Sequence, residues 1–589
     1  MRSLRGRAAV VALTVTALAA AGTIELRAPA WDSSPLNSVV VRHDYRCGRL
    51  DHPEPGLQGQ VPKANQTSGD AKKGYNCGLE LVGFTPLNKT ADGQDTRPNA
   101  NANMYTAGQC AYVSPSSGSL FNPPVVSKQP RGTPGGPGVA VVDVHDPGHP
   151  SMVSVLRTPG AVATSETIGA RTRPDGLAVL VVGQYGNDPV SDPKPMDIYL
   201  YDTRDPDCSH LRHIPNPTDP TNPNAATYYW PKNIHNLTVS PDGNYVWATL
   251  PIQAIDISGI WSHLNDPKVA NRIKYLGTLN DSINAPQEGI GPQNDLVPAN
   301  ANPAHPLEPD NVHEAWVDDN TTLYMGGQTP DGEIFSIVDV STWLASDGAK
   351  PATVISEMAS RGHSIRSATI GGKKYLLHSE ESVFGTAYGC VPQVANPFAG
   401  PAQPWLTDIS DPAHPVTVSQ MGLQINQAGN CQTQVNDGEN DSVHYHDVDN
   451  PADTHFVMAS MWNAGIRIFD VRHPAQPTEV SYFNSADVAP QGQSTRLDHV
   501  WGHLHYDPLA GDVWFASAIG GFYVVRVEDQ VRQQLGLLGH VPPAPATHLV
   551  DGIDGGWPGT TGVTYAAPTI PVDLAPYFCT LAPYNQRTP

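Results

Sequence analysis

Histidines recur near the expected start of one strand in several successive segments of this chain. They are His235 in N-I-H-N-L, His313 in N-V-H-E-A-W, His363 in R-G-H-S-I, His444 and His446 in V-H-Y-H-D, and His499, His503 and His505 in D-H-V-W-G-H-L-H. Imidazole is the commonest metal ligand near neutral pH, and three or four imidazoles around a small opening can hold Zn, Cu or Fe. Because these residues are far apart in sequence, that chemistry requires a fold that returns each of them to one place.

We predict that a metal would be held by His235, His313, His363 and His446. Glu314 or Glu380 would supply acid/base catalysis beside it. Glu166, in T-S-E-T-I-G-A-R, occupies the comparable place in an earlier segment. The alternative is that each histidine bonds to neighbouring backbone and orders its own segment, and the residues alone leave both interpretations open.

The segments are copies of one unit, in which an apolar run ends at a marker residue. The best copies, at 139–150, 405–415 and 466–477, continue from Asp into a turn with two prolines. The markers are spaced by 54 to 83 positions, and they are Asp143, Asp202, Asp256, Asp339, Asp408, Asp470 and Arg526. We expect each marker Asp to bond the amides of the turn that follows it.

Four antiparallel strands in each of seven units predict an all-β, seven-bladed β-propeller. In a propeller the entry strand of each unit is innermost, so its first residues surround the mouth of the central channel. The histidines should therefore converge on one axis. The last unit lacks a fourth strand, and residues 79–87 (L-E-L-V-G-F-T-P-L) are expected to supply it and close the ring, ahead of a first entry strand near 110–113. A short helix is expected around 527–535.

The repeated D-V-x-D-P-x-x-P units, the opening L-E-L-V-G-F and the closing F-Y-V-V-R-V resemble the LVIVD-repeat family of exported propeller proteins, over about residues 79–530. The segment I-H-N-L-T-V-S-P-D-G followed by A-I-D-I-S is similar to selenium-binding proteins (methanethiol oxidases). The first resemblance implies export and a propeller fold. The second implies a copper-dependent enzyme with a histidine-bound metal.

Composition limits the location and the partners. Residues 1–30 have three early arginines, an apolar stretch and an A-x-A site, which predicts a signal peptide and a secreted, extracytoplasmic protein with no membrane span after its removal. The net charge of −22 disfavours nucleic acid as a partner. The expected parts are an N-terminal extension at 31–78, the propeller at 79–535 and a Pro-rich tail at 536–589.

The seven cysteines suit an oxidising compartment, where disulfides form. Cys390 with Cys431 is the first expected pair, and Cys47 with Cys77 is the second. Because the number of cysteines is odd, at least one must remain outside these disulfides, and the sequence leaves the connectivity open.

Two classes of function follow from these features. In the first, the protein is an extracellular binding or scaffold propeller for a cell-surface partner or a small molecule, with the His/Glu-lined channel mouth as its ligand or metal site. In the second, it is a metal-dependent oxidoreductase that uses Cu, Zn or Fe at the same place.

Overall fold

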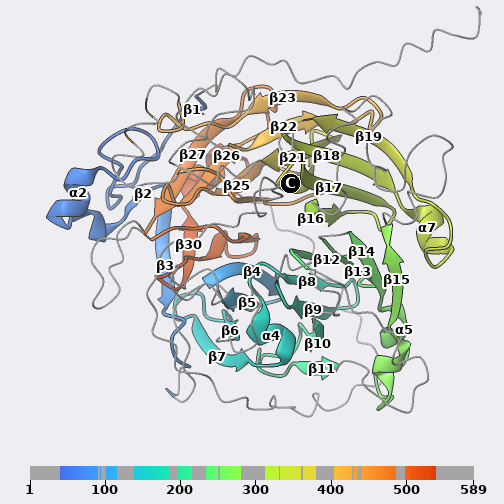
Figure 1. Cartoon of the computed structure of the whole chain (residues 1–589). Coiled ribbons are helices and arrows are strands. Elements are labelled where there is room, and N and C mark those ends of the chain that lie inside the picture. The colour runs from blue at the N-terminus through green and yellow to red at the C-terminus, as the bar shows by residue number, and fades with distance from the viewer. Residues whose placement is uncertain are drawn as a thin grey trace, which may run out of the picture.

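The strands of this computed structural model form seven sheets arranged as a ring, seen face-on in Figure 1. The structure describes residues 40–90, 101–115, 138–185, 196–214, 234–249, 252–279, 312–329, 332–359, 362–379, 403–427, 441–485 and 498–538, together with 93, 430 and 433. The fold is a seven-bladed β-propeller, as predicted from the repeated units.

Each blade is an antiparallel sheet whose strands follow one another in sequence from the inside of the ring outward. Blade 1 contains β4 (Asn101–Ala107), β5 (Cys110–Pro115), β6 (Val139–Asp143) and β7 (Ser151–Leu156). Blade 2 contains β8 (Ile168–Thr172), β9 (Leu177–Gly183), β10 (Met196–Asp202) and β11 (Arg212–Ile214). Blade 3 contains β12 (Leu237–Val239), β13 (Tyr245–Ala248), β14 (Gln253–Asp256) and β15 (Lys274–Thr278). Blade 4 contains β16 (Val312–Val317), β17 (Thr322–Thr329), β18 (Gly332–Asp339) and β19 (Thr353–Ala359).

The remaining blades keep this plan, with additions from the N-terminal part of the chain. Blade 5 contains β20 (Ser364–Ile370), β21 (Lys373–Ser379), β22 (Trp405–Asp408) and β23 (Val416–Gln420). Blade 6 contains β24 (Tyr445–Val448), β25 (Phe456–Ser460), β26 (Ile466–Asp470) and β27 (Thr478–Asn484). Blade 7 contains β28 (His505–Asp507), β29 (Asp512–Ala516), β30 (Phe522–Val527) and, from the N-terminal side, β3 (Leu79–Thr85).

Strand β3 lies antiparallel to β30 at the outer edge of blade 7, with Leu79 opposite Val527 and Thr85 opposite Phe522. The ring is therefore completed by strands from both ends of the described chain, which lie side by side in Figure 1. The predicted first entry strand was wrong in position, because Cys110 begins the second strand of blade 1 and β4 is the innermost. The N-A-N-M-Y-T-A sequence of β4 has a single β-branched residue, Thr106, and no run of apolar residues, which is why the strand is not apparent from the sequence pattern.

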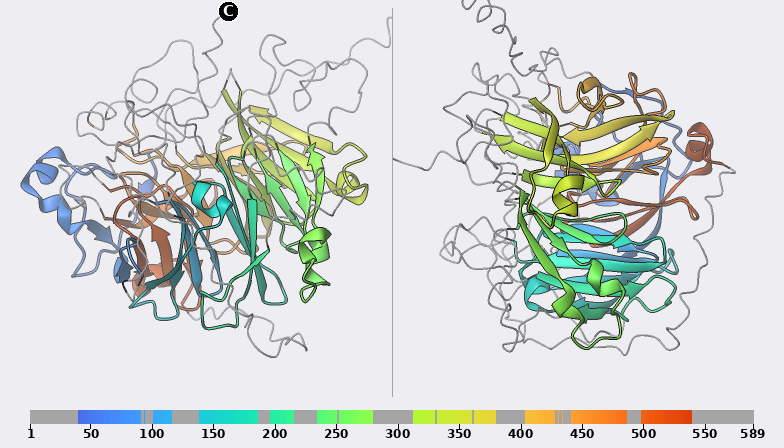
Figure 2. Two further views of the ribbon diagram at one scale, coloured as in Figure 1. Left: turned by 60° about the horizontal axis from the view of Figure 1, so that its bottom comes forward. Right: turned by 90° about the vertical axis from the view of Figure 1, so that its right-hand side faces the viewer.

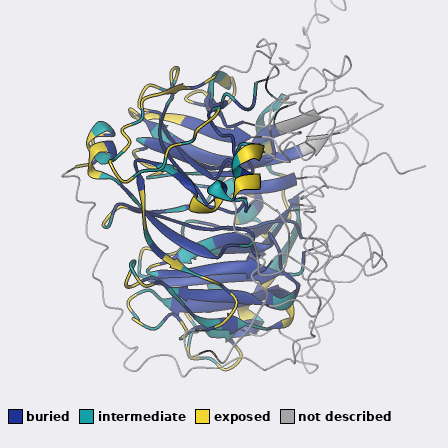
Figure 3. Cartoon of the chain, turned by 90° about the vertical axis from the view of Figure 1, so that its left-hand side faces the viewer, coloured by how far each residue is buried: buried dark blue, intermediate teal, exposed yellow. Residues whose placement is uncertain are grey.

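Apolar clusters fill the interfaces between neighbouring blades. The second strand of a blade is buried on both faces, and β9 accordingly reads as a continuous apolar run, L-A-V-L-V-V-G. Outer strands such as β15 and β23 are only half-buried. Figure 3 shows this gradient, with buried strands inside and exposed residues in the outer strands and turns.

The marker aspartates end their strands as expected. In each case the carboxylate accepts a hydrogen bond from the backbone N–H two residues later, at 2.8–3.0 Å, at Asp143, Asp202, Asp256, Asp339, Asp408 and Asp470. This local turn competes with continued strand pairing and fixes where the chain reverses. Arg526 is different, because it forms an ion pair with Asp512 across the sheet at 2.8 Å.

Helices are few and short in the described residues, and those labelled in Figure 1 lie mostly at the periphery. They are α2 (Lys63–Ser68), η1 (Asp70–Lys73), α4 (Pro159–Ala163), α5 (Ser258–Trp261), η4 (Val269–Arg272), α7 (Ser341–Ala345) and α9 (Asp529–Gln534). The last falls within the helix expected around 527–535. The side views in Figure 2 show the sheets packed next to one another around the ring.

The N-terminal extension packs against blade 6. Strand β1 (Arg42–His43) pairs in parallel with β27, and β2 (Tyr75–Cys77) pairs with the same strand in antiparallel fashion. Beneath them the buried Arg467 forms ion pairs with Glu54 of the extension and with Glu479 of β27. The extension thus supplies a counter-charge to a buried cation of the propeller.

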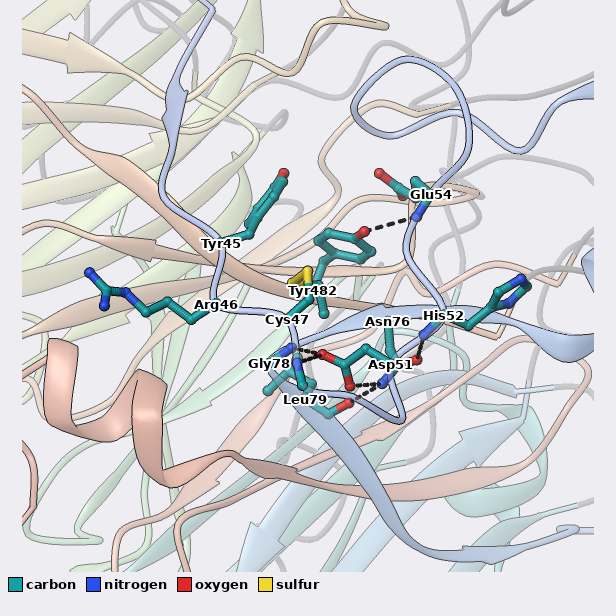
Figure 4. The surroundings of a disulfide bond; sticks show 12 residues. Tyr45, Arg46, Cys47, Asp51, His52, Glu54, Asn76, Gly78, Leu79 and Tyr482 are labelled. Atoms are coloured by element: carbon teal, nitrogen blue, oxygen red, sulfur yellow. Dashed lines mark hydrogen bonds between the residues drawn. A yellow bond between two sulfur atoms is a disulfide. The ribbon is translucent and has the colours of Figure 1, made fainter.

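Two disulfides join described cysteines. Cys47–Cys77 confirms one predicted pair, and Figure 4 shows its surroundings. Cys110–Cys208 was not predicted, and it links β5 of blade 1 to the turn between β10 and β11 of blade 2. Cys390 and Cys431 lie outside the described residues, as do the predicted signal peptide and the Pro-rich tail beyond 538. Among described helices, none has both the length and the apolar character to cross a membrane.

Candidate metal centre on the propeller axis

Five consecutive blades bring an acidic or imidazole side chain to the start of their inner strands. Glu166, His235, His363 and His444 come one or two residues before β8, β12, β20 and β24, and His313 is the second residue of β16. All five side chains are buried, with exposures of 0–1%. Residues at equivalent positions of successive repeats therefore form one cluster in space.

The cluster is tight at three of these residues. One ligand atom from each of Glu166, His235 and His313 lies within 4.8 Å of the others, and His313 Nε2 is 3.7 Å from Glu166 Oε2. In a tetrahedral site with bonds of about 2.0–2.1 Å, ligand atoms are about 3.4 Å apart. Small side-chain movements would bring these three groups to a metal ion.

The imidazoles continue from blade to blade. Ring centroids are 4.0 Å apart for His235 and His313, 3.4 Å for His313 and His363, and 5.0 Å for His363 and His444. The structure thus brings together three of the four histidines predicted to bind metal. His444, not His446, continues the series.

Hydrogen bonds fix the orientation of two of these rings. His313 donates from Nδ1 to the carbonyl oxygen of His363 at 3.0 Å, and His444 donates from Nδ1 to the carbonyl oxygen of Trp501. A ring that donates through Nδ1 keeps its Nε2 lone pair for a ligand, which is the usual arrangement of metal-binding histidines. Both rings are prepared for metal ligation in this respect.

The electrostatics favour neutral imidazoles. Burial lowers the pKa of His313, and the neighbouring His235, His363 and His444 lower it further. Burial also lowers the pKa of His444. Neutral imidazole is the form that binds metal, so these residues need no deprotonation near pH 7.

Tyr445 of blade 6 also contacts the histidine cluster, through Glu166. Its hydroxyl donates a hydrogen bond to Glu166 Oε2 at 2.8 Å, and Asn236 Nδ2 donates to the Tyr445 hydroxyl at 3.3 Å. A hydrogen-bonded carboxylate is held in one orientation, as ligating carboxylates commonly are. Alternation along a strand would place Tyr445 on the face opposite His444 and His446, so this contact with Glu166 is not apparent from the sequence pattern.

The groups that act on His446 are not those that form the histidine cluster. Burial lowers the pKa of His446 to about 3, and the ionisable groups that act on it are Glu314, Arg366, Asp447 and His378. Three of them, Glu314, Arg366 and Asp447, are joined by ion pairs. His446 as a metal ligand therefore remains a prediction without support from its position.

Glu314, predicted to act in catalysis, is part of a buried ion-pair network. Its carboxylate is 2.5 Å from Arg366 Nη1 and 3.1 Å from His503 Nε2, and it accepts hydrogen bonds from the Ser364 hydroxyl and the Ile365 amide. Burial would raise the pKa of Glu314, but Arg366 and His503 lower it far below its usual range. A carboxylate held so firmly in its ionised form is a weak base at neutral pH. Glu380 lies outside the described residues.

A β-bulge explains why His313 and Glu314, neighbours in sequence, both face the channel. The register of β16 against β17 shifts between Val312 and Glu314. A bulge turns one extra side chain toward the same face of the sheet. His313 can then join the histidine cluster while Glu314 pairs with Arg366.

Two other groups of possible ligand residues do not offer the same chemistry. Asp51 lies with Cys47 and Cys77, and Asp143 and His145 lie with Cys208. These cysteines are in disulfides, so their sulfur atoms are not thiolate ligands. In Figure 4 the Asp51 carboxylate instead accepts hydrogen bonds from the Gly78 amide and the Asn76 side chain, both at 2.8 Å.

No protein-family model matches the chain, and no curated protein matches its sequence. The LVIVD-repeat and selenium-binding resemblances therefore stay predictions. Solved structures that are similar include the C-terminal WD40 domain of Sif2, at 8% identity and a TM-score of 0.29 over 62% of this chain and 96% of that one. Another is a complex of KlAtg21 with the coiled coil of AgAtg16, at 7% identity and a TM-score of 0.29 over 60% and 79%. At such low scores, the assignment to a seven-bladed β-propeller rests on the strand pairing in this chain.

Proposed function

We propose that this protein is an extracytoplasmic binding propeller that holds one transition-metal ion on its axis through Glu166, His235 and His313, with His363 as the nearest further imidazole. The observation that carries the proposal is the approach of three ligand atoms from three consecutive blades to within 4.8 Å. Propellers serve widely as binding scaffolds, and the two disulfides are compatible with an extracellular location. Nitrogen and carboxylate donors suit Zn, Cu or Fe.

The burial of these ligand side chains bears on the role of the metal. A divalent cation there would share its charge among several imidazoles and one carboxylate. The burial of all these side chains favours a closed site. A closed site suits a structural or stored metal better than a catalytic one, which keeps a position open.

The test is metal analysis of protein purified without a histidine tag. Wild-type protein should retain about one equivalent of Cu, Zn or Fe per chain, as expected of a single site. His313→Ala should lose it, with metal affinity falling at least about 100-fold because a direct ligand matters more than its supporting partners. Wild-type protein that takes up none of the three metals would contradict the proposal.

A matched control is His378→Gln. His378 is also buried, but its Nε2 lies 2.8 Å from the Thr407 hydroxyl within blade 5, and it contacts Phe335. This variant removes a buried imidazole away from the axis, so it should keep the metal. Equal metal loss in both variants would indicate general unfolding.

The oxidoreductase alternative is favoured by one observation. Two imidazoles and one carboxylate are the donor set of non-haem iron(II) oxygenases, which keep open positions on the metal. Azide added to the copper-loaded or iron-loaded protein distinguishes the two functions. A spectral change would show an open position and favour the enzyme, whereas an unchanged spectrum would favour a closed binding site.

A further inference from the structure

A second polar region lies further along the channel. Arg171 comes five residues after Glu166 on the inner strand of blade 2, and Trp316 comes three residues after His313 on that of blade 4. Inner strands rise about 3.3 Å per residue, so these side chains lie roughly 10–16 Å from the histidine cluster along the axis. Arg171 and Trp316 are half-buried, whereas the histidine cluster is fully buried.

The two side chains meet across the channel. Arg171 Cζ lies 5.2 Å from the Trp316 ring centroid, and Arg366 Cζ of blade 5 lies 4.2 Å from the same ring. Strand β12 of blade 3 packs between β8 and β16, so residues of blades 2 and 4 can touch only by crossing the central opening. The Trp316 indole N–H donates to the Ser367 hydroxyl at 3.2 Å, which fixes the ring.

The half-buried Arg171 differs from Arg366 and Arg467, the buried arginines of blades 5 and 6. Among the described residues, its guanidinium has no hydrogen bond and no ion pair, only the contact with Trp316. Arg366 is neutralised by Glu314 and Asp447, and Arg467 by Glu54 and Glu479. The carboxylate of Asp318, which also acts on Arg171, is paired with Lys374 instead.

The surroundings make this cation costly. Burial lowers the pKa of Arg171, and the charge of Arg366 lowers it further. A partly desolvated charge without a partner destabilises a fold unless something compensates it. The molecule has a net charge of −22, so a cation without an ion pair among the described residues is unusual, and a bound anion would neutralise it.

We propose that this end of the channel binds a small organic carboxylate, with Arg171 as its anchoring cation and the Trp316 side as its apolar wall. The planar guanidinium matches a carboxylate in a two-point hydrogen-bonded pair. One unneutralised positive charge suits a monoanion better than a doubly charged phosphate. The site is separate from the proposed metal site and does not depend on it.

The experiment uses full-length protein treated with a chelator, so that metal binding plays no part. Benzoate, acetate and inorganic phosphate are titrated at constant ionic strength, and binding is followed by calorimetry and by the midpoint of thermal unfolding. Benzoate should bind and raise the midpoint, and Arg171→Gln should weaken its binding at least tenfold. Equal responses of wild-type and Arg171→Gln proteins would overturn the proposal, and tighter binding of phosphate than of benzoate would overturn the carboxylate assignment.

Arg204→Gln is the matched control, because it removes an exposed arginine that is ion-paired with Asp202 at 2.6 Å. It should bind benzoate as the wild type does. Without added anion, Arg171→Gln should unfold close to the wild-type midpoint, because the loss of the contact with Trp316 is offset by the removal of an unpaired charge. A fall in the midpoint larger than the loss of this one cation–π contact can cause would show that another group of the protein neutralises Arg171, and would contradict the proposal.

Discussion

Tyr445 and its two histidine neighbours show how local register decides what a side chain can reach. Alternation along a strand predicts that His444 and His446 share a face and that Tyr445 points the other way. In the structure β24 begins at Tyr445, so His444 lies before the strand and alternation does not govern it. Tyr445 then bonds to Glu166 across the channel, and its ring lies 4.1 Å from that of His503. The histidine cluster could be predicted from the repeat, but its exact membership depended on a strand boundary.

Arg366 should be among the most sensitive residues of the molecule. It is buried between Glu314 and Asp447, and its removal would leave buried carboxylates without their cation. Breaking a buried ion pair costs about 3–5 kcal/mol, so Arg366→Met should lower the free energy of unfolding by that amount. Urea unfolding measures it.

A double-mutant cycle tests whether the cost comes from the pair itself. Glu314→Gln with Arg366→Met should destabilise by less than the sum of the single variants, with a coupling of about 0.5–3 kcal/mol. Strict additivity would mean that Glu314 and Arg366 do not interact as described. Glu314→Gln alone also shows whether this residue matters beyond stability, since it was predicted from sequence as a catalytic group.

Asp498 should make the fold less stable as the pH rises. Burial raises its pKa to about 6, although the amides of His499 and Ile519 donate to the carboxylate at 2.9 and 3.1 Å. The unfolded chain has the ordinary value of about 3.9, so the folded state binds more protons between these limits. Stability therefore falls as pH rises from about 4 to 6, by an amount on the order of 3 kcal/mol.

Asp498→Asn removes this titration. The variant should be more stable than the wild type above pH 6, and the difference should vanish toward pH 4, as urea unfolding across this range would show. Asp202→Asn is the control of opposite sign: the pKa of Asp202 is lowered by its bonds to Arg204, which outweigh the effect of burial. A wild-type profile unchanged by Asp498→Asn would contradict the assignment.

At the scale of elements, the Cys47–Cys77 disulfide anchors the extension next to the strand that completes the ring. Only Gly78 separates Cys77 from β3, and the Gly78 amide donates to Asp51 at 2.8 Å (Figure 4). The same extension carries Glu54 to the buried Arg467. By anchoring the extension, the disulfide therefore positions both Glu54, the counter-charge of Arg467, and β3 at the edge of blade 7.

Replacing both cysteines by serine should destabilise the protein by about 3–4 kcal/mol, because the disulfide closes a loop of 30 residues in the unfolded chain. Hydrogen exchange should show faster opening of β3 and β30 than of blade 3. The matched control is the double serine variant at Cys110 and Cys208, which should loosen blades 1 and 2 instead. Uniform exchange changes across the ring would contradict the local role.

The elements that sequence predicted best are those with a local cause. Each marker aspartate accepts a hydrogen bond from the backbone two residues later, so its effect depends only on residues a few positions away in sequence. The Cys110–Cys208 bond joins residues 98 positions apart in neighbouring blades, and only the folded ring brings them together. Likewise, neither the pairing of β1 and β2 with β27 nor the free guanidinium of Arg171 has a signature in sequence.

At the scale of the whole molecule, seven apolar clusters join every blade to the next. The cluster between blades 7 and 1 contains Trp514 and Phe522 from one side and Met104 and Val113 from the other. It closes the circle that begins with the contact between blades 1 and 2. The repeated unit made this architecture predictable, because each blade buries its faces only against its neighbours.

The outer position of β3 in blade 7 has a consequence for folding during synthesis. The strand ends at Thr85 and its blade begins at His505, about 420 positions later, which a ribosome adding roughly 5–20 residues per second covers in about 20–80 s. Throughout that time β3 has no sheet to join, and its open edge could pair with other chains. The first blades can form as they emerge, but the finished ring can exist only after nearly all the described chain has been made.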